Sequence, residues 1–218
     1  MDTVFERVIG LGSDCATKRG INLFFTPSQP WLKTKKGHSD LFDWLIIKDY
    51  RLLADAFFRN LDDFFELQDF IFPGTPINSK YNMDWCHLGH KLDNNGDWNR
   101  QETTMKTHDD FIRLFDDTKN KIEYLKKKFI NSQDKNAIYI ITEDKRWNKE
   151  IDLSTLIYLR DSITHIRNGN KNFCLVLSSE NPKFESFENI LVIHSLSPWN
   201  GNYVNILSNF KFTSNIWA

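Results

Sequence analysis

The C-terminal third of the chain alternates apolar runs with a helical pattern. Three runs, 137–142, 172–178 and 190–194, are almost entirely apolar. Residues 153–166, between the first two runs, repeat apolar side chains at helical spacing. Strands without polar alternation are typical of a parallel sheet that is covered on both faces. The pattern therefore predicts an α/β fold of three layers with a mainly parallel central sheet.

A further strand is expected near the N-terminus, over residues 4–12, and it ends in a Gly-Leu-Gly run. A short helix over about residues 14–21 is expected to follow, with Gly20 as its stop signal. Cys15 then lies at a strand-to-helix turn. The first turn of a helix presents unpaired N–H groups and the positive end of the helix dipole. Such a site lowers the pKa of a cysteine and favours the reactive thiolate.

Two helices are predicted in the middle of the chain. Residues 48–60 carry apolar side chains at spacings of three and four. A longer helix follows Thr107, which can form an approximate capping box with Asp110. The polar residues 26–36 and 89–100 are predicted to be loops.

No linker stands out, so one domain over residues 1–218 is expected, with residues 131–136 as the best place for a division. A terminal helix, from about Trp199 to Phe210, is expected to dock on the sheet. The chain holds 28 Lys and Arg against 29 Asp and Glu, so bulk charge does not attract it to nucleic acid or anionic membranes.

The composition also bears on location. No run approaches the roughly 18 apolar residues of a membrane span, and the first residues lack a signal-peptide pattern. Three cysteines, an odd and low number, do not suggest a disulfide framework. A cytoplasmic protein is therefore expected, and its oligomeric state is not predicted.

A cysteine–histidine nucleophilic pair needs an imidazole within hydrogen-bond reach of Cys15. Among six histidines, His87 and His90 follow the short strand expected over residues 81–86, where active-site loops commonly lie. His194 ends a predicted strand and is a further candidate. On spacing alone, a buried structural cysteine is the commoner interpretation of Cys15.

Asp43 lies between Phe42 and Trp44 in an apolar segment. Burying a carboxylate without a partner is costly, so Asp43 needs one. The partner could be a backbone N–H group, a basic residue or a catalytic histidine. A cap or structural hydrogen bond is the simpler of these interpretations.

Cys86, His87 and His90 are close in sequence and form a candidate metal site, and Cys15 would complete a Cys2His2 set. Zinc sites usually combine two tightly spaced ligand pairs, and the second pair is missing here. No metal is therefore predicted.

The same turn is a candidate nucleotide site. Gly10, Gly12 and Cys15 stand at the three positions of a dinucleotide fingerprint. The third position normally holds the glycine that allows close packing of helix and strand, and Cys15 has a side chain there. No cofactor is therefore predicted, and a tight turn is the simpler interpretation.

Three sequence runs together resemble a known family. They are Gly12-Ser13-Asp14-Cys15, Phe42-Asp43-Trp44 and Tyr81-Asn82-Met83-Asp84-Trp85-Cys86-His87. In this order they resemble a domain-of-unknown-function family that is described as papain-like cysteine peptidases and occurs in bacteria and large DNA viruses. Leu41 stands where that family tends to have proline.

The resemblance implies roles for particular residues. Cys15 would be the nucleophile, His87 the base and Asp43 a third member. The backbone N–H groups of Ser13 and Asp14, in the turn that Gly12 opens, would help to bind an oxyanion. The resemblance also implies a papain-like α+β fold as the alternative to the three-layer α/β fold.

The resulting hypothesis is a cysteine-dependent hydrolase or acyl transferase. Its substrate would be a peptide, amide, ester or glycan-linked compound. The alternatives are a nucleotide- or sugar-binding, transferase-like protein of surface-glycan metabolism, and a scaffold without activity. In the first alternative the glycine-rich turn would hold a phosphate.

Overall fold

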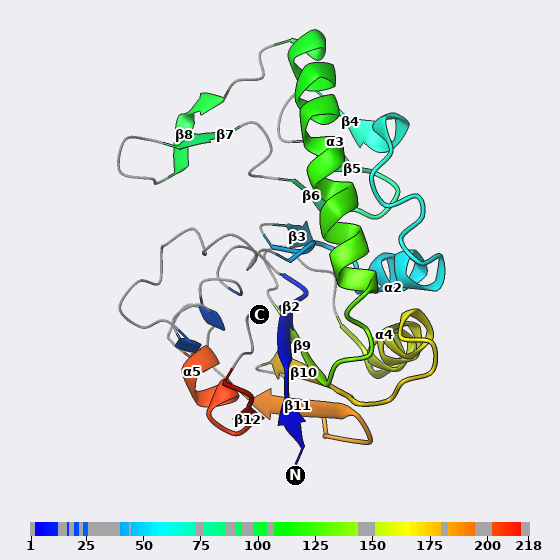
Figure 1. Cartoon of the computed structure of the whole chain (residues 1–218), viewed down its shortest axis with the longest axis vertical. Coiled ribbons are helices and arrows are strands. Elements are labelled where there is room, and N and C mark those ends of the chain that lie inside the picture. The colour runs from blue at the N-terminus through cyan, green and yellow to red at the C-terminus, as the bar shows by residue number, and fades with distance from the viewer. Residues whose placement is uncertain are drawn as a thin grey trace.

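A four-stranded parallel sheet lies in the lower half of the computed structural model as Figure 1 shows it. Its strands are β2 (Arg7–Gly10), β9 (Ala137–Thr142), β10 (Phe173–Ser179) and β11 (Ile190–His194), in the order β11-β10-β9-β2. All residues of β9 and β10 are buried, as expected for strands covered on both faces. The predicted α/β class with a parallel sheet is confirmed.

The structure describes only part of the chain. The described residues are 3–12, 17, 20–21, 24–25, 40–43, 45–72, 76–85, 90–92, 98–103, 107–143, 151–179, 183–194 and 202–214.

Helices cover both faces of the parallel sheet (Figure 1). On one face, side chains such as Ile9, Tyr139 and Leu175 join the core of α2 (Tyr50–Phe58), α3 (His108–Ile130) and α4 (Leu153–Ile166). On the other face, the alternate side chains, among them Val8, Ile138, Ile140 and Val176, pack with Ile21 and α5 (Asn202–Leu207). The period of two along each strand divides the core in this way.

The long helix α3 begins as its sequence predicts. The N–H group of Asp110 donates to Oγ1 of Thr107 over 3.1 Å, and the N–H group of Thr107 donates to Oδ2 of Asp110 over 3.0 Å. This reciprocal pair is a capping box. The buried residues of the helix form one stripe: Phe111, Phe115, Ile122, Leu125 and Phe129.

A second, antiparallel sheet lies beside the first one. It consists of the two-residue strands β3 (Ile46–Ile47), β6 (Met83–Asp84), β5 (Ile77–Asn78) and β4 (Phe70–Ile71), in that order, and a 3-10 turn, η1 (Leu67–Asp69), precedes β4. Only β6 lies within the strand expected over 81–86. That strand is shorter because Tyr81 and Asn82 form a turn in which Asn82 has a positive φ of 50°.

Two further expectations were wrong in detail. The N-terminal strand divides at Glu6, because β1 (Val4–Phe5) pairs with β12 (Lys211–Phe212) while β2 pairs with β9. The loop expected over 89–100 includes an antiparallel pair, β7 (His90–Leu92) and β8 (Trp98–Thr103). The sequence between the two strands contains Asn95-Gly96, a dipeptide that is favoured in hairpin turns. This dipeptide could have been used to predict the strand pair.

Arg167 connects the segments that enter β9 and β10 at the amino end of the sheet. Its side chain is buried, with 2% of the residue exposed. The guanidinium donates to the carbonyl oxygens of Lys135, Asn170 and Asn172 over 2.8, 3.1 and 3.2 Å. It also donates to the hydroxyl oxygen of Tyr139 over 3.5 Å.

We predict that Arg167→Met lowers the free energy of unfolding by about 3 kcal/mol, because buried carbonyl oxygens lose a charged donor. The control is Arg113→Met, which removes a 72% exposed arginine side chain and its ion pair with Asp110. That change is expected to cost less than about 1 kcal/mol. Urea denaturation measures both variants, and equal losses would contradict the prediction.

Candidate functional site

The chain that leads to Cys15 is held firmly at the carboxyl end of β2. This edge is where parallel α/β sheets bind ligands. The N–H group of Leu11 donates to the carbonyl oxygen of Ile140 over 2.9 Å and so extends the pairing with β9. The hydroxyl of Tyr50, the first residue of α2, donates to the carbonyl oxygens of Leu11 and Gly12, each over 3.1 Å.

Gly12 lies directly against the backbone of another segment. A methyl group built on Gly12 would lie 2.6 Å from the carbonyl oxygen of Leu45, so only glycine fits without a backbone shift. The space beside Gly12 is therefore filled by protein. In a dinucleotide fingerprint the corresponding glycine leaves that approach open to a pyrophosphate, so the contact does not support the nucleotide alternative.

A helix begins soon after this turn. Thr17 is helical, and a methyl group built on Gly10 would lie 2.8 Å from its Cγ2 atom. The predicted change from strand to helix between Gly10 and Thr17 is therefore confirmed. Gly20 was wrongly predicted to stop this helix, because Gly20 and Ile21 are themselves helical. Ser13, Asp14 and Cys15 themselves lie outside the described residues.

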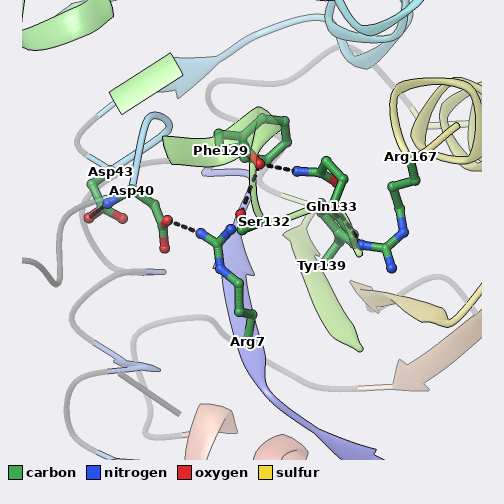
Figure 2. Close-up of polar contacts among 8 residues, drawn as sticks. All are labelled: Arg7, Asp40, Asp43, Phe129, Ser132, Gln133, Tyr139 and Arg167. Atoms are coloured by element: carbon green, nitrogen blue, oxygen red, sulfur yellow. Dashed lines mark hydrogen bonds and ion pairs between the residues drawn. The ribbon is translucent and has the colours of Figure 1, made fainter. Parts of the chain in front are cut away.

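A chain of buried polar contacts ties Asp43 to β2 (Figure 2). Arg7 forms an ion pair with Asp40, and the N–H group of Asp40 donates to Oδ2 of Asp43 over 2.8 Å. Both aspartates are 8% exposed. Asp43 thus makes a hydrogen bond to a backbone N–H group, as the simpler sequence interpretation expects. Trp44, which follows Asp43 in the sequence and is a secondary candidate for the site, lies outside the described residues.

The strand pair β3 and β6 joins this segment to the one that precedes His87. Ile46 pairs with Asp84 and Ile47 with Met83 in an antiparallel register. Leu45 and Trp85, the residues that adjoin these strands, therefore lie at the same end of the pair.

Trp85 is an unusual neighbour of that end. It is 5% exposed and packs against the rings of Phe64, Phe65 and Phe70. Its indole N–H group is buried, and we find no hydrogen-bond partner for it within the described residues. An unpaired buried donor costs roughly 1–3 kcal/mol, so such a group calls for a reason beyond packing.

Of the three candidate histidines, His194 alone has a side chain within the described part of the structure. His87 lies outside the described residues, as does Cys86. His90 is the first residue of β7, and its side chain is not described. His194 is exposed at the carboxyl end of β11, and two strands separate it from β2. At about 4.8 Å between neighbouring strands, this separation is about 14 Å.

Three residues of this region were missed by sequence reasoning: Arg7, Asp40 and Tyr50. Arg7 and its neighbour Glu6 interrupt an apolar run, and a charge that is buried in such a run needs a partner. That signal could have pointed to Arg7. No local pattern marks Tyr50 as a residue that binds the end of β2, because Leu11 lies 39 positions away.

The comparisons with known proteins found no matching family model, no matching curated protein and no matching solved structure. Within the described ranges, we find no group of three or more His, Cys, Asp and Glu residues that could hold a metal ion. None of the described helices has both the length and the apolar character needed to cross a membrane.

We predict that Asp43→Ala lowers the free energy of unfolding by about 1–2 kcal/mol, because the buried N–H group of Asp40 loses its acceptor. Asp43→Asn keeps an oxygen at that position and is expected to lose less. Urea denaturation compares the two variants. If both lose the same stability, the negative charge of Asp43, and not the hydrogen bond, stabilises the segment.

Proposed function

We propose that the chain is a cysteine-dependent hydrolase or acyl transferase in which Cys15 is the nucleophile and His87 the general base. The observation that carries the proposal is the contact of Gly12 with Leu45, taken together with the register of β3 and β6. These features bring the flanks of the three residues named by the family resemblance to one region.

The length of the covalent chain supports this pairing. Cys15 follows Gly12 by three residues, and His87 follows Trp85 by two. A fully extended chain spans at most about 3.6 Å per residue. The Cα atom of Cys15 is therefore within about 11 Å of that of Gly12, and the Cα atom of His87 within about 7 Å of that of Trp85. Since Gly12 touches Leu45, and Leu45 and Trp85 adjoin one strand pair, the covalent chain allows the two side chains to meet.

The proposed reaction has two steps. His87 accepts the proton of the Cys15 thiol, and the thiolate attacks the carbonyl carbon of the substrate while backbone N–H groups of Ser13 and Asp14 bind the oxyanion. The imidazolium then protonates the leaving amine or alcohol, and a thioester remains on Cys15. Water or another acceptor, deprotonated by His87, attacks the thioester and releases the acyl group and the thiolate.

The substrate is proposed as a class only: a peptide, amide, ester or glycan-linked acyl compound. The central sheet is parallel, so the likeness to papain-like peptidases is proposed for the chemistry and not for the sheet. Unrelated folds share such cysteine chemistry, because a site depends on its local geometry.

Alkylation of Cys15 tests the proposal. We expect iodoacetamide to modify Cys15 with an apparent pKa below about 7, and His87→Gln to move that value towards about 8.5. Peptide mapping by mass spectrometry over a range of pH measures the rates. Cys174 in β10 is an internal control, because burial raises the pKa of its thiol to about 12 and it should react only after unfolding.

His194→Gln is the matched control, because it removes an exposed imidazole at the far side of the sheet. This variant should keep the wild-type profile, and Cys15→Ala should remove the labelling. With a p-nitrophenyl acetate substrate, an acetyl group should appear on Cys15. An ordinary pKa at Cys15 that His87→Gln leaves unchanged would contradict the proposal, as would a Cys15 that never reacts in the folded protein.

A further inference from the structure

Tyr203 of α5 joins the segment after Cys15 to the carboxyl edge of the sheet. Its hydroxyl donates to Oγ1 of Thr17 over 3.1 Å and lies 2.8 Å from Oγ1 of Thr142, the last residue of β9. All three residues are 1% exposed. In this buried series of hydrogen bonds, the Tyr203 hydroxyl donates to Thr17 and accepts from Thr142.

The ring of Tyr203 makes a second contact with the same helical segment. A methyl group built on Gly20 would lie only 2.0 Å from Cδ2 of that ring. On the opposite side, Thr17 lies against Gly10 of β2. The helical residues after Cys15 are therefore held between the strand that precedes the cysteine and a tyrosine from the C-terminal helix.

We infer that Tyr203 is a positioning residue for the Cys15 thiol, an inference that rests on the proposed function of Cys15. The hydroxyl fixes the helical segment after Cys15 on the sheet. Thr17 follows Cys15 by two residues, so a loss of this support is expected to change the reactivity of the thiol. A reactive group depends on such support, because displacements of about 1 Å can cost a hundredfold in rate.

The same sheet offers a matched control at its other end. Tyr139 is fully buried in β9, donates from its hydroxyl to Oε1 of Gln133 over 2.7 Å, and accepts from Arg167. Tyr139→Phe therefore removes a buried, doubly bonded tyrosine hydroxyl, as Tyr203→Phe does. Tyr139 faces the opposite side of the sheet, in the core of α2, α3 and α4.

The experiment measures the rate of Cys15 alkylation against pH in wild type, Tyr203→Phe and Tyr139→Phe. We expect Tyr203→Phe to slow the reaction at pH 6.5 about fivefold or more, because the thiolate loses part of its stabilisation. Tyr139→Phe should keep the wild-type profile. Hydrogen exchange should become faster at Thr17, Gly20 and Ile21 in Tyr203→Phe alone.

Two further variants keep the test open if Tyr203→Phe does not fold. Thr17→Val removes the acceptor of the Tyr203 hydroxyl with little change in side-chain shape, and it should act as Tyr203→Phe does. Thr17→Ser keeps the hydroxyl and should keep the wild-type profile.

The inference is overturned if the Cys15 profile is unchanged in Tyr203→Phe, or in Thr17→Val where that variant replaces it. It is also overturned if Tyr139→Phe changes the profile equally. In those cases the dependence of Cys15 on His87 would still stand. An ordinary pKa of Cys15 in the wild type would overturn the proposed function and this inference together, and no tyrosine variant is needed to see it.

Discussion

The close approach of Gly12 to the carbonyl oxygen of Leu45 is the constraint on which the region depends. Strand β2 of the parallel sheet ends at Gly10, two residues before Gly12, and the antiparallel sheet begins at Ile46, immediately after Leu45. Any side chain at position 12 would push the two apart. The hydroxyl of Tyr50 then provides a donor for the carbonyl oxygens of Leu11 and Gly12, which this approach draws into the interior.

The ion pair of Arg7 and Asp40 has a different part in the same arrangement. Burying both charges removes their hydration, so the pair is weak evidence for a gain in stability. It does link β2 to the segment of Asp43, which is 33 residues or more further along the chain. We interpret the pair as a device that fixes which segment lies against the end of β2.

Sequence reasoning was most successful where the pattern is long and local. The bounds of β9, α4 and β11 agree with the predicted ranges, because continuous apolar runs and a helical period each extend over several residues. The antiparallel sheet was missed, since a strand of two residues such as β3 has no period to detect. Its pairing depends on contacts with β6, far along the chain.

The candidate site divides in the same way. The change from strand to helix between Gly10 and Thr17 could be predicted, because glycines follow the end of an apolar strand. The contact between Thr17 and Tyr203 could not be predicted, because 186 positions separate the two residues and neither local sequence indicates the contact. The local sequence indicates which backbone conformation a segment can adopt. Tertiary contacts of this kind determine where in the fold that segment lies.

The described residues on either side of Cys15 in the sequence are supported from opposite faces of the sheet. Leu11 and Gly12 are held by Tyr50 and Leu45, which belong to the core of α2 and α3, and Thr17 is held by Tyr203 of α5. Cys174 is one of the buried residues of β10 that pack on the face of α5, and its burial raises the pKa of the thiol. A thiol that served only to fill the core would need no more than the environment of Cys174. If Cys15 is the proposed nucleophile, the support of its flanking residues from both faces, through hydroxyl groups and closely packed glycines, would serve to fix the direction of the thiol.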